Sequence, residues 1–220
     1  MNTTIRADFH VHTKYSMDST ARLEDIIARC QKKGIGCVAV TDHNAIEGGL
    51  RMKELAPFTV IPGEEILTPH GEVVGYFLRE WIPSGQSIEK VFEAIKAQGG
   101  LIGLPHPFDT FRGLKVDNRR LEELAAQVDV VEVFNARGPI PADASKALAF
   151  ATRFNLPATA GSDAHSPMEI GNTYVEMPSF SGKEDFLQAL RAGVIHRRRS
   201  SPLVHLYTML AKIKRSRRKR

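Results

Sequence analysis

Residues 5–12 of the chain read IRADFHVH, a strand-like stretch that ends in two histidines spaced two residues apart. Ile5–Phe9 is typical of a buried strand, and side chains at positions i and i+2 leave a strand on the same face. His10 and His12 are therefore expected to point the same way from the end of the first strand. Both imidazoles can then reach a single metal ion.

Four more polar clusters follow apolar runs in the same manner. They are TDHN at residues 41–44, GEE at 63–65, LPHP at 104–107 and GSDAH at 161–165. Asp163 and His165 repeat the spacing of two after the last predicted core strand. One histidine near a strand end is more often a hydrogen-bonded residue than a ligand, and the glutamates of 63–65 also fit a solvated loop. Two spaced pairs with three further candidate ligands favour a metal centre.

Short apolar runs alternate with helical patterns along most of the chain. The predicted strands are Ile5–Phe9, Cys37–Val40, Thr59–Ile61, Val73–Leu78, Leu101–Leu104, Val130–Phe134 and Ala158–Ala160. Helical spacing of apolar residues marks residues 23–30, 88–95 and 121–128, and further helices are predicted at 144–154 and 183–192. The alternation predicts an α/β fold of parallel strands joined by crossovers, a compact barrel in preference to an open sheet. The strand ends of a barrel share one rim, so the polar clusters are expected to converge there.

Charge is distributed unevenly along the 220 residues, whose formal net charge is +5. Residues 197–220 hold ten Lys and Arg and no acidic residue, which leaves 20 basic and 25 acidic residues in positions 1–196. We predict one domain over residues 1–196 and a basic, partly helical tail over residues 197–220. Cys30 and Cys37 are too few for a disulfide framework, and no apolar run has the length of a membrane span. A cytoplasmic protein is expected.

The candidate ligands combine imidazole and carboxylate groups without thiolate. Such a set suits Zn²⁺, Mn²⁺ or Fe²⁺ and argues against a cysteine-rich structural zinc site. More than four ligands imply more than one ion, and a carboxylate such as Glu65 or Asp163 can bridge two ions. The candidates at this stage are His10, His12, His43, Glu65, His106, Asp163 and His165. Two ions roughly 3.5–4 Å apart suit hydrolytic phosphoryl transfer.

Taken together, five motifs resemble those of the PHP (polymerase and histidinol phosphatase) family of metal-dependent phosphoesterases. They are DFHVHTKYSMDS, AVTDHN, IPGEE, LPHP and AGSDAH, in that order. The resemblance runs from Asp8 to about Tyr174 and continues more loosely through SSPLVH near Ser200. It implies a distorted, seven-stranded (β/α) barrel that binds two or three metal ions at the carboxyl-terminal rim.

The resemblance also implies which residues hold each ion. The first would be held by His10, His12, Glu65 and Asp163, the second by Glu65, His106 and one further ligand, and the third by Asp18, His43 and His165. Asp18 stands where many relatives have a histidine, which shifts the metal preference toward harder ions. Glu72 is the candidate for the further ligand, although an exposed carboxylate at a strand start explains it equally well. Asp42 is expected to support a ligand imidazole.

The mechanism that follows from the resemblance has no protein nucleophile. A hydroxide that bridges two ions attacks phosphorus, and His43 or His165, if not fully engaged by a third ion, protonates the leaving oxygen. With Asp163, these two histidines are the predicted catalytic residues. Arg137, which follows a strand, and Arg112, in the 108–113 loop, are candidates for binding the phosphate. A surface arginine in a loop is an equally good explanation of both.

We therefore expect hydrolysis of a phosphate ester of a nucleotide, a small phosphorylated metabolite or a nucleic-acid end. One alternative is an amidohydrolase, whose barrel also opens with an HxH motif. The other is a nucleic-acid-associated module that binds through the basic tail, where Leu203, Leu206, Tyr207 and Leu210 form an apolar stripe. Packing of that stripe on the barrel explains the tail equally well. The oligomeric state stays open.

Overall fold

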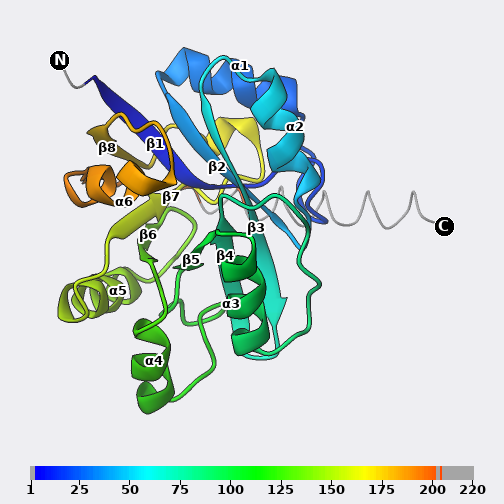
Figure 1. Cartoon of the computed structure of the whole chain (residues 1–220). Helices are drawn as coiled ribbons and strands as arrows, with labels where there is room; N and C mark the ends of the chain where they lie inside the picture. The colour runs from blue at the N-terminus through cyan, green and yellow to red at the C-terminus, as the bar shows by residue number, and fades with distance from the viewer. Residues whose placement is uncertain (1–2, 202–203, 205–220) are drawn as a thin grey trace.

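The computed structural model describes residues 3–201 and residue 204. Its elements in chain order are β1 (Thr4–Val11), α1 (Leu23–Lys33), β2 (Cys37–His43), α2 (Glu47–Leu55), β3 (Thr59–Thr68), β4 (Gly71–Tyr76), α3 (Ile88–Ala97), β5 (Leu101–Leu104), α4 (Asn118–Ala125), β6 (Val130–Asn135), α5 (Pro141–Arg153), β7 (Ala158–Gly161), the 3-10 helix η1 (Pro167–Glu169), β8 (Tyr174–Pro178), α6 (Lys183–Arg191) and β9 (Val194–His196). These residues form one sheet in the order β7-β6-β5-β4-β3-β2-β1-β8-β9, with the helices around its outside (Figure 1). Among them, no helix has the length and apolar character needed to cross a membrane.

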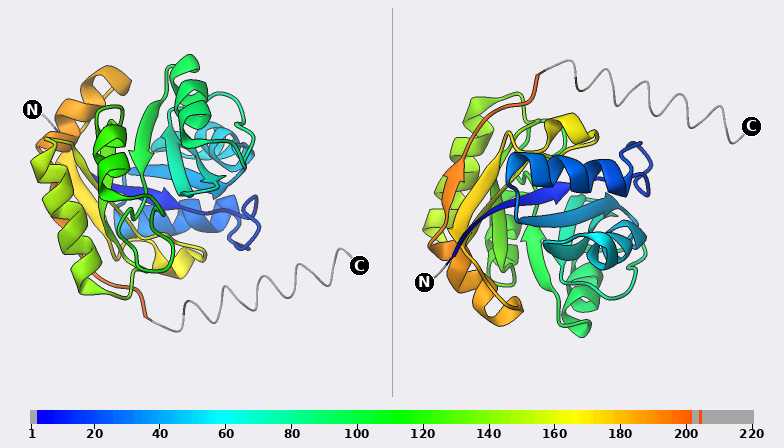
Figure 2. Two further views of the ribbon diagram at one scale, coloured as in Figure 1. Left: turned by 90° about the horizontal axis from the view of Figure 1, so that it is seen from below. Right: turned by 90° about the horizontal axis from the view of Figure 1, so that it is seen from above.

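The sheet curls until its first and seventh strands meet, which makes a nearly closed barrel (Figure 2). The beginning of β1 pairs with β8, whereas its last residue, Val11, forms a parallel bridge with Ala164 just after β7. Between them, the Ser162 amide donates to the Asp8 carboxylate at 2.9 Å. Where β1 meets β7, the Asp8 side chain thus takes the place of a backbone carbonyl as hydrogen-bond acceptor. The predicted α/β barrel is confirmed.

One of the seven barrel strands runs against the predicted all-parallel arrangement. β4 is antiparallel to both β3 and β5. Only residues 69–70 separate β3 from β4, and a parallel partner requires a much longer crossover. The prediction of parallel strands throughout is therefore wrong at this position. As a consequence, Glu72 at the start of β4 reaches the same rim as the ends of the parallel strands.

Besides the short 3-10 helix η1, three elements escaped the prediction for local reasons. The helix α2 contains Gly48 and Gly49, and glycine has a low helix propensity. The strand β8 (YVEMP) alternates buried and half-buried residues and has no long run of consecutive apolar positions, and β9 has only three residues. Both strands lie at the edge of the sheet beyond β1, outside the seven strands that form the barrel.

Alternate side chains of the strands build an interior core and an outer layer under the helices. The interior cluster includes Phe9, Ile61, Val74, Tyr76, Val130 and Phe134. On the outside, α2 packs on β2 and β3, α3 on β4 and β5, α5 on β6, and α6 on β7 and β8. The apolar side chains fill one part of the barrel interior, and polar side chains line the rim at the carboxyl ends of the parallel strands.

A bulge in β1 changes the face that its side chains meet. The register with β2 shifts between Asp8 and Val11, so one extra residue is accommodated in this part of the strand. Phe9 packs in the interior core, and His10 with its i+2 neighbour His12 also points into the barrel. The bulge therefore lets an apolar core residue and two metal-ligand candidates share one side of the sheet.

The first residues of the basic segment are bound to the barrel. The Ser200 amide donates to the Ala136 carbonyl at 2.8 Å, and the Thr173 hydroxyl donates to the Arg198 carbonyl at 2.9 Å. The Arg199 guanidinium lies 5.7 Å from the centre of the Phe134 ring. The apolar stripe from Leu203 to Leu210 lies outside the described residues. The domain boundary after residue 196 and nucleic-acid binding by the tail stay predictions.

Glu64 and Glu65 lie on opposite faces of β3, because strand side chains alternate. Both are buried within the strand, so a solvated loop does not describe them. Glu65 faces the interior rim. Glu64 is covered by the segment after β4, where its Oε2 accepts a hydrogen bond from the Ile82 amide at 3.0 Å. Burial raises the pKa of Glu64 to about 8.

Replacing Glu64 with Gln is expected to stabilise the protein increasingly as the pH rises. The folded-state pKa of about 8 lies above the ordinary value of 4.5, so the folded state holds the proton more tightly. Its contribution to stability therefore falls as the pH rises between these two values. Melting temperatures measured across that range should show a growing gap between Glu64→Gln and the unmodified protein. An exposed control, Glu80→Gln, should show none, and a gap independent of pH would contradict the assignment.

Candidate metal centre

The side chains predicted as metal ligands meet in one connected group at the rim of the barrel. They come from β1, the loop after it, the ends of β2, β3, β5 and β7, and the start of β4. Within this group, four sets of three or four side chains have donor atoms that all lie within 4.8 Å of one another: His12, Asp18, His43 and His165; His10, His12 and Asp163; His10, His106 and Glu132; and His43, Glu65 and Glu72. All nine predicted ligands belong to the group.

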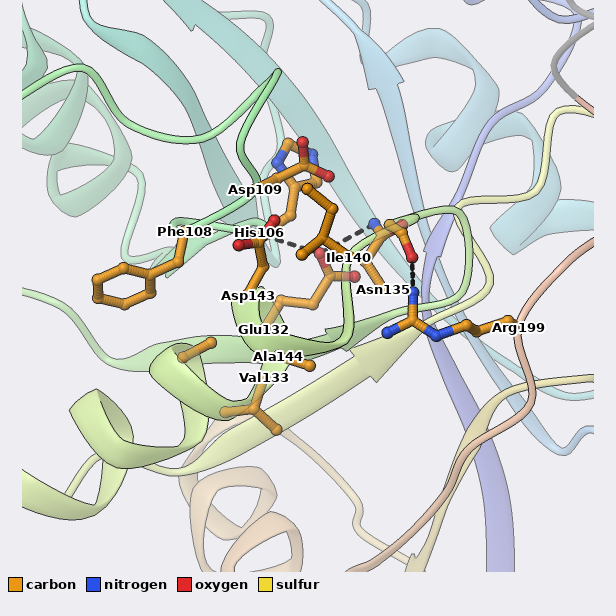
Figure 3. A pocket seen from close by; sticks show the side chains of 12 residues that line it. His106, Phe108, Asp109, Glu132, Val133, Asn135, Ile140, Asp143, Ala144 and Arg199 are labelled. Carbon is orange, nitrogen blue, oxygen red and sulfur yellow. Dashed lines mark hydrogen bonds between the residues drawn. The ribbon is translucent and has the colours of Figure 1, made fainter. Parts of the chain in front are cut away.

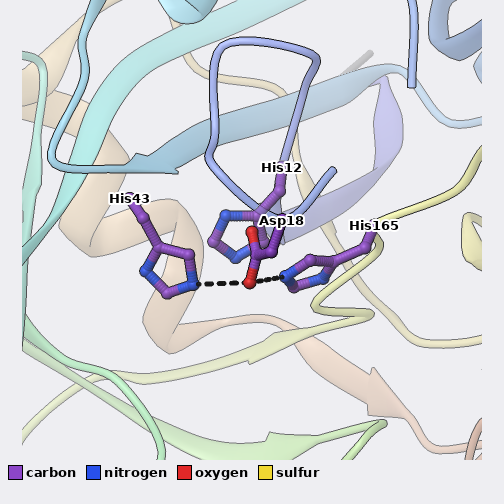
Figure 4. A group of neighbouring side chains, drawn as sticks. All are labelled: His12, Asp18, His43 and His165. Carbon is purple, nitrogen blue, oxygen red and sulfur yellow. Dashed lines mark ion pairs between the residues drawn. The ribbon is translucent and has the colours of Figure 1, made fainter. Parts of the chain in front are cut away.

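In the first set, the three histidines His12, His43 and His165 lie around the Asp18 carboxylate (Figure 4). Its Oδ2 lies 3.1 Å from His165 Nε2 and 3.4 Å from His43 Nε2. The His12 ring lies between the other two rings, with centroid separations of 4.2 Å to His165 and 4.5 Å to His43. Three imidazoles and a carboxylate therefore face a shared space.

The Glu65 carboxylate links this set to the rest of the centre. Its Oε2 lies 3.3 Å from His10 Nε2, 3.5 Å from His12 Nε2 and 3.1 Å from His43 Nδ1. Its other oxygen, Oε1, lies 3.1 Å from His106 Nε2. On the opposite side, Asp163 Oδ1 lies 3.2 Å from His12 Nε2. Glu65 thus contacts imidazoles that belong to several of the ligand sets.

Glu72 lies inside this group and is not an exposed carboxylate at a strand start. Its Oε1 lies 3.4 Å from His43 Nδ1, and its Oε2 lies 3.8 Å from His106 Nε2. Burial, together with the negative charge of Glu65, raises the pKa of Glu72 to about 7. A cation between the two carboxylates would remove that repulsion, which fits Glu72 as a ligand.

The pKa values of His12 and Asp18 are also shifted in the directions that favour cation binding. Burial, together with the neighbouring His165 and His43, lowers the pKa of His12 to about 3, so this ring is in the neutral form that binds metals. Neither of its nitrogens makes an aligned hydrogen bond with a described residue, although the ring is buried. Burial works against ionisation of Asp18, yet hydrogen bonds from His165 and His43 hold its pKa well below the usual range.

Backbone conformation at the rim is unusual where ligands are presented. His106 has a φ of 29° and Asp163 a φ of 52°, in the left-handed region that residues with side chains rarely adopt. Such conformations persist only when the surroundings fix them, and they concentrate at functional sites. The two ligand candidates are held in this way at the ends of β5 and β7.

Asp42 holds a loop and does not support an imidazole, which corrects the expected role. Its carboxylate accepts from the Thr13 amide at 2.5 Å and from the Thr13 hydroxyl at 2.6 Å. This contact fixes the start of the loop that carries Asp18. Within that loop the Ser16 hydroxyl donates to Asp18 Oδ1 at 2.8 Å, which orients the carboxylate toward the histidines.

The two arginines predicted to bind phosphate lie at the centre and contact ligand candidates. Arg112 donates from Nη1 to Asp163 Oδ2 at 2.5 Å and from Nη2 to Asp109 Oδ2 at 3.0 Å. Burial works against ionisation of Asp163, but Arg112 holds its pKa well below the usual range. Arg137 is buried, with Nη1 2.6 Å from His165 Nδ1 and Nε 3.3 Å from Glu169 Oε2.

A pocket opens beside this centre and encloses about 300 Å³ of space, part of it open to solvent (Figure 3). His106 and Glu132 form the side nearest the other ligand candidates. The apolar part of its wall consists of Phe108, Val133, Ile140, Ala144 and Ala147. Asn135 and Arg199 add polar groups, and the Arg199 guanidinium donates to the Gly138 carbonyl.

Several known proteins resemble this chain in sequence or structure. A family model described as PHP-associated matches residues 142–195. The uncharacterised protein MJ0417 of Methanocaldococcus jannaschii is 36% identical over 200 residues, which cover 85% of this chain and 79% of that protein. The chain belongs to the PHP family.

Two further similarities to PHP-type proteins cover different extents of the chain. A probable histidinol-phosphatase of Thermotoga maritima is 43% identical over 42 residues, 19% of this chain and 18% of that protein. A two-domain protein of Bacteroides vulgatus, described as containing a predicted PHP-like metal-dependent phosphoesterase, has a similar structure. Its TM-score is 0.71 at 19% identity, over 96% of this chain and 70% of that chain. At this identity the structural similarity establishes the PHP-type fold.

Sequence reasoning missed several residues that complete this PHP centre. Glu132 contacts His10, Asp109 holds Arg112, and Glu169 accepts a hydrogen bond from the His165 amide at 3.1 Å. The signal for Glu132 was available, because it is one carboxylate in an otherwise apolar predicted strand, Val130–Phe134. Asp109 and Glu169 lie in polar segments without such a contrast.

Zn²⁺ or Mn²⁺ added to chelator-treated protein should raise the melting temperature. An ion that binds only the folded state at a hundred times its dissociation constant adds about 2.7 kcal/mol, or roughly 5–10 °C for a chain of this size. His12→Ala should lose much of the shift, because His12 belongs to two of the ligand sets. The surface control His196→Ala should keep it. Equal shifts in both variants would contradict the assignment.

Proposed function

We propose that this chain is a metal-dependent phosphoesterase that hydrolyses small phosphate esters. The observation that carries the proposal is the Glu65 carboxylate, which lies among four imidazoles in a centre that two arginines also contact. A carboxylate shared in this way suits more than one divalent ion, and guanidinium groups suit phosphate oxygens. The PHP-type phosphoesterase similarities support the same reaction class.

The three ion positions in this proposal are those implied by the family resemblance. His10, His12, Glu65 and Asp163 would hold one ion, Glu65, Glu72 and His106 a second, and Asp18, His43 and His165 a third. Divalent ions of the zinc, manganese or iron type supply activation of water and neutralisation of phosphoryl charge. The protein's part is to hold the ligands close together and to bind and orient the ester.

His43 is well placed to give a proton to the leaving oxygen. Its side chain is 18% exposed, whereas those of His10, His12, His106 and His165 are at most 4% exposed. Burial alone would lower its pKa, but the carboxylates of Glu65, Asp18 and Glu72 raise it to about 9. Where His43 is not engaged by a third ion, its protonated ring near the surface of the site has the form that general acid catalysis requires. His165 is the second candidate for this role.

Arg112 is the candidate for orienting the phosphoryl group. Its side chain is 34% exposed, and the planar guanidinium presents several donors in a fixed fork. Asp109 and Asn135 hold one end of that fork, with Asn135 Oδ1 3.3 Å from Nη2. Arg137 is buried against His165 and Glu169, so its part is to hold His165.

An amidohydrolase is the alternative reaction class for this centre. The presence of arginine donors beside the carboxylates favours a phosphoester, and the reaction products separate the two classes. Release of inorganic phosphate from nucleotides, sugar phosphates or short oligonucleotides supports the proposal. Cleavage of amides or carboxylic esters without phosphate release would replace it.

The double variant Asp163→Ala/His165→Ala should lose phosphate release. The two residues belong to different ligand sets, so their removal disrupts two ion positions at once. Phosphate release should be measured with Mn²⁺, Zn²⁺ and Mg²⁺ in parallel. Asp25→Ala/His196→Ala removes the same side-chain types from exposed positions and should retain activity. Undiminished turnover in the first variant would remove the catalytic assignment.

Arg112→Lys should lower kcat/KM roughly 10- to 100-fold, the loss expected for charged hydrogen bonds worth about 1.5–3 kcal/mol. Lysine keeps the positive charge beside Asp163 but loses the two-pronged contact with a phosphoryl group. Steady-state kinetics on the best phosphoester measures the change. Arg119→Lys on the exposed face of α4, where the arginine side chain is 90% exposed, is the matched control. Unchanged kinetics would exclude Arg112 from substrate binding.

A further inference from the structure

Glu132 makes contacts on both sides of the metal centre although it is not among the nine predicted ligands. It lies on β6 and is 3% exposed. One carboxylate oxygen, Oε1, is 3.1 Å from His10 Nδ1. The other, Oε2, accepts from the His106 backbone amide at 2.9 Å and from the Asn135 side chain at 3.1 Å. One side chain therefore touches two ligand candidates from different strands.

The contact between Glu132 and His10 determines which nitrogen of the His10 ring is free to bind a metal ion. A carboxylate oxygen only accepts hydrogen bonds, so His10 Nδ1 carries the proton in this contact. The lone pair of a neutral ring is then on Nε2, the atom that lies 3.3 Å from Glu65 and 3.9 Å from Asp163. Carboxylates that hold a metal-binding imidazole in this way raise its basicity and fix its orientation.

The contact between Glu132 and His106 involves the His106 backbone amide. The φ of 29° at His106 is unfavourable for a residue with a side chain, and the hydrogen bond from its amide to Glu132 helps to hold that conformation. In this conformation His106 Nε2 lies 3.1 Å from Glu65 Oε1. The same carboxylate therefore supports one ligand through its ring and the other through its main chain.

The neighbouring strand leaves room for this arrangement. A Cβ atom at Gly161 of β7 would overlap the His10 side chain and lie 2.7 Å from Glu132 Oε1. Only glycine at this position allows the two side chains to meet across the interior of the barrel. The absence of a side chain at Gly161 therefore makes the contact between His10 and Glu132 possible.

We propose that Glu132 is a positioning residue that presents His10 and His106 to the metal ions without binding an ion itself. The proposal rests on the metal-dependent function proposed above. An amide cannot replace the carboxylate, because it has a single accepting oxygen, and here acceptors are needed toward both His10 and His106. Glu132→Gln, which keeps size and shape, therefore removes one of the two supports.

The test measures Zn²⁺ binding to full-length, metal-free protein by competition with a chromophoric chelator, without any phosphoester. Glu132→Gln should weaken Zn²⁺ binding roughly 10- to 100-fold with the number of ions unchanged, as for other supports of ligand histidines. The exposed control Glu80→Gln should bind as the unmodified protein does. Because no substrate is present, failure of the phosphoesterase proposal does not affect this result.

Nitrogen NMR of the Zn²⁺-loaded protein gives a second measurement that a general loss of stability does not mimic. His10 should show a protonated Nδ1 and a metal-bound Nε2 in the unmodified protein and an altered pattern in Glu132→Gln. Unchanged Zn²⁺ affinity together with an unchanged His10 pattern in the variant would overturn the proposal. Loss of one bound ion with the others unaffected would also overturn it, because Glu132 would then be a ligand.

Discussion

The contact of four imidazoles with the Glu65 carboxylate is the interaction on which the rest of the centre depends. His10, His12, His43 and His106 all lie within 3.5 Å of its two oxygens. Buried ionisable groups are stable only when they are paired or bind ions. A carboxylate at this point of β3 gives each imidazole a partner, and it leaves the centre suited to cations that two or more ligand sets share.

Two irregularities of the barrel bring the other ligand candidates to Glu65. The bulge in β1 allows His10 and His12 to face the interior after Phe9 has packed in the core. The reversal of β4 places the start of that strand, and with it Glu72, beside His43 and His106. A regular parallel barrel would direct the start of this strand to the opposite end, away from the ligands.

Around the ligand candidates lies a second layer of charged and polar groups that fixes their orientation. Arg112 neutralises Asp163, Arg137 and Glu169 hold His165, and Asp42 anchors the loop of Asp18 through Thr13. These contacts are buried or partly buried, where electrostatic interactions are stronger than in water. The rim is thus organised by the protein's own side chains, and His43 and Arg112 keep partly exposed edges there.

The sequence by itself determined the strand and helix alternation, the α/β barrel class and the identity of the ligand candidates. Periodicity and strand-end position are local properties, and they gave seven of the nine ligand candidates. Asp18 and Glu72 were implied only by the family resemblance of the motifs. The tertiary structure decided the direction of β4, the place of Glu72 in the centre, and the partners of Asp42 and Arg112. It also brought Glu132 to His10 from a strand more than a hundred residues away. These depend on contacts between distant segments, and only the closure of the barrel determines which side chains meet across its interior.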